Sequence, residues 1–451
     1  MPELPLDGIR VLDSTYVFAL PYTGGHLADL GAEVIKIEGP TRPDLTRNGG
    51  LFGSFPENEQ GGDWWNRSST YNLLNRGKES LVLDLSTERG RELFKELVSI
   101  SDVVMENFTP RVMRGWNLDY PNLKKIKPDI ILISNTGYGH GDGPYSSYPA
   151  QATTQEGTHG HCWVTGYAGE EPAKAGRSFV DFLSTWTGIF AIGAALRYRS
   201  LTGKGQWIDI AMYQAGAMFL SEYVMDAIAN EREGERIGNR HPHRIPQGCY
   251  PAAGVDQWIT LSVGSDEEWI GLCGLMGEPD LTRDPRFGDI IARFKNHDAL
   301  DDLIRKWTNK FDKYELMHML QDKGIPAGPV LTGQEVHFDE HYQSRNFLER
   351  VTYPDDRNMG TRLLMGRPYK YSNTPLKIRK PAPSFGAENE YLLKDLLGLS
   401  VDDYDKLIEQ ATISSVPLSG DPAPRIDPRQ SVEEGLLGHW DPDYRDHLGI
   451  S

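Results

Sequence analysis

Short β-branched runs alternate with amphipathic segments along the first half of the chain. Residues 21–30 and 87–98 are predicted helices, and the apolar side chains of the second recur at helical spacing. Ser86 stands where the N-cap of that second helix is expected. Strands that alternate with helices favour a parallel sheet with helices on both faces. The predicted strands are residues 9–12, 33–37, 80–85, 102–105 and 129–134.

The middle of the chain carries two further helical patterns. Residues 181–199 are rich in Ala, Leu, Ile and Phe and end at LTGKGQ, whose glycines suit a helix C-terminus. The next segment, QWIDIAMYQAGAMFLSEYVMDAIA, passes from a short strand pattern into a second long helix. Residues 230–250 are charged, contain Gly and Pro and lack periodicity, so we expect a hinge there.

Length and turn signals divide the chain. At 451 residues it exceeds what one hydrophobic core usually supports. A smaller unit begins near Tyr250, with a strand at WITLSV and several amphipathic helices, and GIPAGPV after it suits a return linker. From Ser414 the sequence is Pro-rich, and we expect it to cover a surface without regular structure. The predicted large domain comprises residues 1–225 and 332–451, and the predicted small domain comprises residues 226–331.

Composition narrows the classes of function. The net charge of −17 argues against nucleic acid or an anionic membrane as the main partner, because both bind basic surfaces. Cys162, Cys249 and Cys273 are widely spaced and odd in number, which encodes neither a disulfide framework nor a zinc site. The first residues, MPELPLDGIRVLD, lack the features of a signal peptide, and we find no run of about 18 apolar residues. We therefore expect a cytoplasmic protein.

Common catalytic motifs are missing. No GxGxxG follows a strand, and neither GxxxxGK[ST] nor GxSxG occurs, so the phosphate-binding turns and the serine elbow have no counterpart. His241 and His243 are two residues apart with a proline between them and no acidic or Cys companion, so we predict no metal. His140, His159 and His161 lie in glycine loops, where a structural role and an acid–base role both stay open.

Seven stretches of the sequence, taken in order, indicate one family. Together they resemble the family III CoA-transferases, which include formyl-CoA, oxalate and carnitine CoA-transferases and the related α-methylacyl-CoA racemases. The match extends from residue 6 to about residue 331. The stretches are LDGIRVLDSTYVFALPYTGGHLADLGAEVIKIEGP, NRGKESLVLDL, MENFTP, SNTGYG, DFLSTWTGIFAIGAALRYRSLTGKGQWIDIAMYQA, GNRHPH and GIPAGPV.

The resemblance implies a fold and a ligand. The fold would be α/β, with a Rossmann-like large domain from both chain ends, a small α+β middle domain, and two chains threaded through each other as interlocked rings. A CoA thioester would bind in the cleft between the domains as a substrate, and no cofactor would be bound permanently. The resemblance places CoA contacts at Val17, Phe18, Ala19, Leu74, Asn75, Lys78, Asn107, Phe108, Arg114, Thr136 and Gly137.

Some of these positions have clear physical roles. Lys78 and Arg114 would offset phosphate charge, and Phe108 would offer an apolar wall. Two positions depart from the family pattern: Phe18 stands where a glutamine is usual, and Gly39 where a basic residue is frequent.

The loop TGYAGEEP departs from the family at the reacting atom. In transferases of this family the loop resembles TGxxDGPP, and its aspartate attacks the acyl-CoA thioester to form an anhydride and then an enzyme-bound CoA thioester. Gly169 occupies that position here, and glycine has no nucleophile. Glu170 follows it and is our fallback candidate, although reacting atoms must approach within about 3 to 3.5 Å.

The racemase branch of the family is disfavoured. Its members use a histidine from a Gly-His-Asp triplet and an aspartate ahead of the next helix. Here the triplet position holds Ala150, Gln151 and Ala152, which supply neither base. Asp181 matches the second group, yet an aspartate at a helix N-terminus is also explained by capping.

Three hypotheses follow. The first is a CoA-transferase subunit that lacks the nucleophile, which a sister subunit supplies, as the resemblance to benzylsuccinate-type CoA-transferases implies. Such an enzyme moves CoA from succinyl-CoA to an organic acid of the aromatic or dicarboxylic kind. The second is a homodimeric transferase that uses Glu170 or Glu171. The third is a non-catalytic CoA-binding protein.

Overall fold

A six-stranded parallel sheet forms the centre of the larger of two compact units. The computed structural model describes residues 4–49, 55–176, 178–424 and 427–450. The large unit comprises Met1–Gly160, Gly176–Ser221 and Glu340–Ser451, and the small unit comprises His161–Ala175 and Glu222–Asp339. In the order β3-β2-β1-β4-β5-β6, the strands are β1 (Arg10–Asp13), β2 (Glu33–Glu38), β3 (Glu79–Val82), β4 (Val103–Glu106), β5 (Ile131–Thr136) and β6 (Trp207–Ala211).

This strand order confirms the predicted doubly wound α/β fold. β1 pairs in parallel with β2 on one side and with β4 on the other, so the direction of winding reverses at β1. In open parallel sheets, ligands bind outside the carboxyl ends of the strands at such a reversal. The turns that follow β1 and β4 therefore lie where a ligand is expected.

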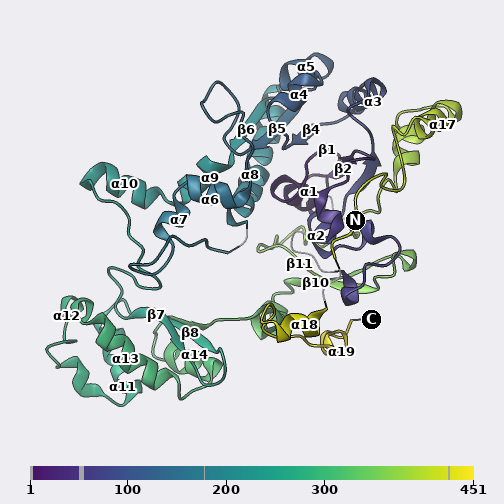
Figure 1. The fold of residues 1–451 in the computed structure, drawn as a ribbon. Coiled ribbons are helices and arrows are strands. Elements are labelled where there is room, and N and C mark those ends of the chain that lie inside the picture. Colours follow the sequence, from purple (N-terminus) through teal and green to yellow (C-terminus); the bar gives the residue numbers. More distant parts are fainter. Residues whose placement is uncertain (1–3, 50–54, 177, 425–426, 451) are drawn as a thin grey trace. The chain divides into compact units, whose positions relative to one another are not determined.

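Helices cover both faces of the sheet (Figure 1). Alternate strand residues divide between two cores: Leu12 packs with Phe94 and Leu97, whereas Val11 packs with Leu27 and Ile192. The helices of the large unit that follow strands β1 to β6 are α1 (Ala19–Asp29), α2 (Ser69–Leu74), α3 (Glu88–Ser99), α4 (Arg111–Gly115), α5 (Tyr120–Ile126), α6 (Ala152–Thr158), α8 (Phe179–Thr202) and α9 (Met212–Phe219).

Two local predictions about helices were wrong. The N-cap of α3 is Thr87, whose hydroxyl accepts a hydrogen bond from the Gly90 amide, so Ser86 precedes the cap by one residue. The long helix predicted after β6 is two helices, α9 and α10 (Ser221–Asn230), which meet at Leu220.

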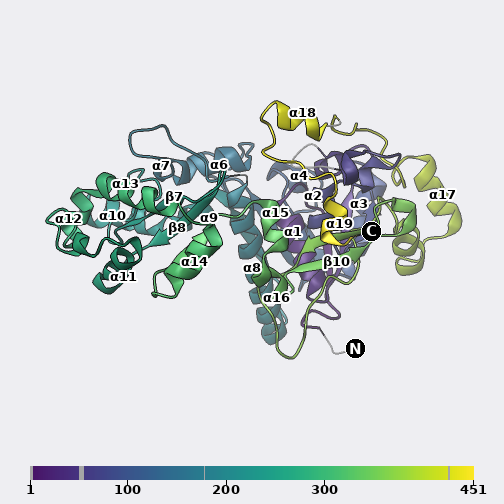
Figure 2. The same ribbon diagram turned by 90° about the horizontal axis from the view of Figure 1, so that it is seen from below.

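Helix α8 is more apolar than the sequence analysis expected. Its 24 residues contain a window of mean hydropathy 1.5, enough by length and composition alone to cross a membrane, a test that core helices of soluble proteins also pass. It packs along α1 (Figure 2). Thr185 donates a hydrogen bond to the Ala19 carbonyl, and Thr23 donates one to the Thr185 carbonyl. Gly203, with φ of 69°, ends the helix as predicted.

The C-terminal part of the chain returns to the large unit, in agreement with the predicted contribution of both chain ends. Glu388 and Asn389 accept hydrogen bonds from the amides of Ser80 and Val82, so the returning chain covers the free edge of β3. The returning segment contains α16 (Glu340–Ser344), the antiparallel pair β10 (Leu348–Thr352) and β11 (Thr361–Met365), a helical turn (Tyr391–Leu396) and α17 (Val401–Glu409).

The Pro-rich tail is more regular than predicted. It contains two short helices, α18 (Pro428–Glu433) and α19 (Tyr444–Leu448). Between α17 and α18, the Leu418 amide donates to the Pro40 carbonyl and the Ala423 amide donates to the Asn48 carbonyl. The tail is therefore bound along the segment that follows β2.

The small unit has its own sheet and core. Residues 324–330 were predicted to be a linker, but they contain strand β9, which pairs with β8 through Ile259, Thr260 and Leu261. The antiparallel strands of the small unit are β7 (Gln247–Pro251), β8 (Trp258–Ser262) and β9 (Ala327–Pro329). Its helices include α7 (His161–Val164), α11 (Asp266–Met276), α12 (Ile290–Lys295), α13 (His297–Thr308), α14 (Lys313–Gln321) and α15 (Gly333–Phe338).

Candidate functional site

The turn between β1 and α1 is held in an unusual conformation. Val17 has φ of 73°, in the left-handed region that β-branched residues avoid. Its amide donates to both carboxylate oxygens of Asp44, at 3.2 and 3.3 Å. Non-glycine residues with positive φ cluster at functional sites, where the surrounding structure maintains the strain. Two predicted CoA contacts, Val17 and Phe18, lie in this turn, and a third, Ala19, is the first residue of α1.

The turn after β4 is hydrogen-bonded to the turn between β1 and α1. The Asn107 side chain accepts a hydrogen bond from the Tyr16 amide at 2.8 Å and donates one to the Tyr16 carbonyl at 2.7 Å. Phe108 lies between Tyr16 and Trp116, with ring centroids 5.8 and 5.6 Å away. The structure thus brings Asn107 and Phe108 against the turn that precedes Val17.

Lys78 lies inside the fold rather than at an open surface. Its ammonium donates to an Asp13 carboxylate oxygen at 2.6 Å, to the Pro21 carbonyl at 2.7 Å and to the Asn75 side chain at 2.7 Å. Burial lowers the pKa of Lys78 to about 8, although Asp13 acts in the opposite direction. All three N–H groups of the ammonium therefore have acceptors within the fold, and a phosphate would have to displace one of them.

The remaining predicted contacts differ in accessibility. Leu74 is buried in a small apolar cluster with Phe18 and Tyr22. Thr136 and Gly137 end β5, and a side chain at Gly137 would collide with Ala150. Arg114 lies on the exposed side of α4, and among the described residues no carboxylate pairs with its guanidinium.

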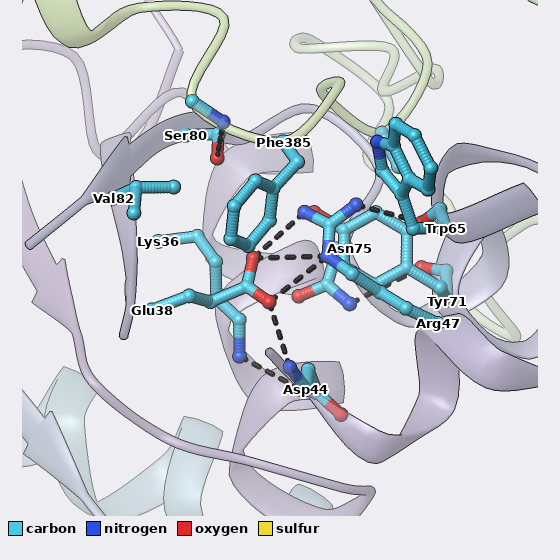
Figure 3. A network of polar contacts seen from close by, with 12 residues as sticks. Lys36, Glu38, Asp44, Arg47, Trp65, Tyr71, Asn75, Ser80, Val82 and Phe385 are labelled. Atoms are coloured by element: carbon cyan, nitrogen blue, oxygen red, sulfur yellow. Dashed lines mark hydrogen bonds and ion pairs between the residues drawn. The ribbon is translucent and has the colours of Figure 1, made fainter. Parts of the chain in front are cut away.

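A network of buried charges supports the carboxyl end of β2 (Figure 3). Lys36 pairs with Asp44 at 2.9 Å and Glu38 pairs with Arg47 at 2.7 Å, and all four side chains are fully buried. Burial alone would lower the pKa of Lys36 and raise that of Asp44, but their mutual attraction shifts both in the opposite directions. Both groups are therefore charged at neutral pH.

A second group of titratable side chains lies at the carboxyl ends of β4 to β6. Asp209 accepts hydrogen bonds from the backbone amide of His140 and bonds the Nδ1 of its ring, both at 2.9 Å. Nε2 of that ring lies 4.0 Å from a carboxylate oxygen of Glu106, whose other oxygen accepts the Phe108 amide at 2.9 Å. Burial raises the pKa of Glu106 to about 7, although Ser134 and His140 oppose the shift.

The raised pKa of Glu106 predicts a pH-dependent stability. Because the folded-state pKa of about 7 exceeds the ordinary value of 4.5, ionisation costs stability that is progressively lost between those two pH values. The free energy of unfolding of Glu106→Gln, relative to that of the native chain, should therefore rise by about 3 kcal/mol between acidic pH and pH above 7. Denaturant unfolding at pH 4.5, 6 and 8 measures this difference. Glu92→Gln, at an exposed helix position, is the control; a flat difference for Glu106→Gln would contradict the prediction.

The loop TGYAGEEP, which lacks the aspartate of the family's transferases, belongs to the small unit. A turn spans Tyr167 to Glu170, with a hydrogen bond from the Glu170 amide to the Tyr167 carbonyl at 3.1 Å. Gly169 occupies its third position with φ of 80°. Arg236 donates to the carbonyls of Glu170 and Trp163, so the hinge segment predicted from sequence braces this loop.

Neither acidic side chain of this loop is committed to a structural contact. Glu170 and Glu171 are exposed, and their carboxylates form no hydrogen bond or ion pair within the described residues. Asp181, which matches the second racemase group, lies in the first turn of α8. Gln151, the middle residue of the triplet where the racemases have their histidine, is the N-cap residue of α6.

Within the part of the chain that the structure describes, no group of three His, Cys, Asp or Glu side chains could hold a metal ion. The residues that support the candidate site were not predicted from the sequence: Asp13, Lys36, Asp44, Glu106 and Asp209. One signal was available, because Lys36 lies between two isoleucines in the strand EVIKIE, and a lysine that is buried must be paired.

Comparisons with the sequences of known proteins point to one family. The model of CoA-transferase family III matches residues 6–389. Succinyl-CoA–D-citramalate CoA-transferase of Chloroflexus aurantiacus is 32% identical over 89% of this chain and 96% of that protein. The β subunit of succinyl-CoA–L-malate CoA-transferase from the same organism is 30% identical over 91% of this chain and 98% of that protein.

A solved structure gives the same result for the fold. The crystal structure of a CaiB/BaiF family protein from Brucella suis has a TM-score of 0.77 and 33% sequence identity, and the match covers 87% of this chain and 100% of that chain. The parallel sheet, the helices on both of its faces and the extent of the sequence match point to a single conclusion. The chain belongs to CoA-transferase family III.

Proposed function

We propose that this chain is a CoA-transferase subunit that works with a sister subunit carrying the nucleophilic aspartate. The observation behind the proposal is Gly169, which leaves bare backbone where the family's transferases have the attacking carboxylate. The donor is succinyl-CoA and the acceptor is an organic acid, as in the names of the two Chloroflexus aurantiacus relatives. One of those relatives is itself named as a subunit, which supports a heteromeric enzyme. The proposed location is the cytoplasm.

In this proposal, CoA lies against the turns that follow β1, β4 and β5. Arg114 contributes an exposed guanidinium for a phosphate, and Phe108 contributes an apolar surface. Asn75 and Lys78 support the site from within the fold, since the Lys78 ammonium donates to the Asn75 side chain, to Asp13 and to the Pro21 carbonyl. Leu74 packs with Phe18 in one apolar cluster, and Thr136 and Gly137 approach the ligand from the end of β5.

Exposed apolar side chains support association with a second chain of the same fold, threaded as interlocked rings. Phe190 on α8 and Met218 on α9 each have 78% of their surface exposed, and Trp186 and Leu201 on α8 are also exposed. Large apolar groups that cluster on a soluble enzyme usually mark an interface.

The composition of the native complex tests the proposal. Mass measurement of the intact complex purified from its source organism should show two different chains, and the complex should transfer CoA from succinyl-CoA. The chain expressed alone should bind CoA but accumulate no hydroxylamine-sensitive thioester. An active homodimer whose thioester disappears in Glu170→Gln would instead establish the alternative in which Glu170 is the nucleophile.

A further inference from the structure

The turn of residues 15–17 is fixed at almost every polar backbone group. The ammonium of Lys36 donates to the Thr15 carbonyl, and the Asn107 side chain bonds both the amide and the carbonyl of Tyr16. The Tyr16 hydroxyl accepts a hydrogen bond from the Gly39 amide at 3.1 Å. The next group along the chain is the Val17 amide, and its acceptor is the Asp44 carboxylate.

The contact with Asp44 holds the strained residue. A valine with φ of 73° avoids this conformation in a free chain, because its branched side chain crowds the backbone. Since an ionised carboxylate accepts hydrogen bonds about twice as strongly as a neutral acceptor, Asp44 favours the conformation that aims the Val17 amide at it. Without this acceptor, the turn would relax toward an extended conformation.

Asp44 is itself rigid. Its carboxylate accepts from Lys36 at 2.9 Å and from the hydroxyl of Thr46 at 2.8 Å, and its amide donates to Glu38 at 2.8 Å. Figure 3 shows Asp44 joined by dashed lines to both Lys36 and Glu38 near the end of β2. Because Glu38 is in turn paired with Arg47, the acceptor for Val17 cannot rotate away without breaking the buried network.

We propose that Asp44 is a positioning residue of the CoA site: together with Lys36 it holds the 15–17 turn in the left-handed conformation in which CoA is bound. This inference rests on the proposed function, since it assumes that the turn contacts CoA. Asp44 does not touch the ligand in this account. It acts by keeping the binding-competent turn populated in the free protein.

Isothermal titration with CoA tests the role of Asp44. The variant Asp44→Asn removes the charge but keeps the size of the side chain, and it should weaken CoA binding about tenfold, the factor that corresponds to one non-glycine residue in the left-handed region. Asp29→Asn is the matched control. Asp29 is a buried carboxylate paired with Arg76 and Arg367 in the same unit, but it makes no hydrogen bond to residues 15–17. It should lose stability and keep its affinity for CoA.

A second variant separates positioning from general loss of structure. Glycine adopts positive φ without steric cost, so in a Val17→Gly background the substitution Asp44→Asn should weaken CoA binding by about threefold or less. Hydrogen exchange should show faster exchange of amides 15–19 in Asp44→Asn than in Asp29→Asn.

The possible outcomes are distinct. If the native chain binds no CoA, the proposed function fails and this role fails with it. If the native chain binds CoA and Asp44→Asn binds it equally well, only the positioning role is overturned. Equal losses of affinity in Asp44→Asn and Asp29→Asn would also overturn it, because a loss of stability alone would then explain the effect.

Discussion

The variant Gly169→Asp should form a covalent adduct with CoA when the chain, expressed alone, is mixed with succinyl-CoA. The aspartate oxygen would attack the thioester carbon and release CoA thiolate, which leaves a succinyl–aspartyl anhydride. The thiolate would then attack the aspartyl carbonyl and release succinate. The product, an enzyme-bound CoA thioester, differs from the free chain by the mass of CoA less one water.

The local backbone admits this substitution. A Cβ at position 169 would meet no atom within 4 Å. The positive φ of 80° disfavours most side chains, but Asp and Asn tolerate it best among non-glycine residues, at a cost of about 1 kcal/mol. The contacts of Arg236 with the Trp163 and Glu170 carbonyls do not involve the side chain at position 169.

Intact-protein mass measurement, with and without hydroxylamine, reports the adduct. Gly169→Asn has nearly the same shape and no nucleophilic oxygen, so it should form none, and neither should the native chain. If Gly169→Asp folds and binds CoA but stays unmodified, this loop does not present position 169 to the thioester. The assignment of Gly169 as the site of the lost nucleophile would then be wrong.

The sheet could be predicted from sequence because its signal is local. β-branched runs between helical patterns gave five strands whose ends differ from the structure by no more than three residues, for example residues 129–134 against Ile131–Thr136. The C-terminal tail could not be predicted in this way. Its contacts with Pro40 and Asn48 join residues that are far apart in sequence, and they appear in no periodicity.

The support of the candidate site was missed for the same reason. Lys78 and Asp13 are 65 residues apart, and Tyr16 and Asn107 are 91 apart, so neither pair leaves a pattern within one window. The family resemblance places Lys78 at the CoA site, where its ammonium would offset phosphate charge. In the structure the Lys78 ammonium is buried and already has acceptors at Asp13, Pro21 and Asn75, which the sequence alone does not reveal.

Substitution of Arg47 by alanine should destabilise the large unit by about 3–5 kcal/mol, the usual cost of removing one partner from a buried ion pair. Glu38 would keep a buried charge without its cation. The guanidinium also donates to the Trp65 carbonyl and the Tyr71 hydroxyl and lies 3.7 Å from the centre of the Tyr71 ring. Loss of Arg47 therefore also leaves polar groups in the surrounding segments without a donor.

Arg47 also lies against the C-terminal part of the chain, so its loss should destabilise segments from both the N-terminal and the C-terminal parts. Its guanidinium lies 5.0 Å from the ring of Phe385, whose amide donates to Asn66, which also bonds Arg47. Unfolding by guanidinium chloride can be followed by near-UV circular dichroism. The large unit of Arg47→Ala should unfold at a lower denaturant concentration than that of the native chain.

Two further variants separate loss of the buried pair from loss of charge in general. Arg89→Ala removes an arginine whose side chain is 40% exposed and whose partner Glu92 is 52% exposed, so its cost should stay below about 0.5 kcal/mol. The double variant Glu38→Leu with Arg47→Met removes both buried charges and should be more stable than Arg47→Ala, because no charge is then left unpaired in the interior. If the double variant were the less stable of the two, the network at the end of β2 would stabilise the fold through the attraction between its charges, and the cost of an orphaned carboxylate would not be the dominant effect.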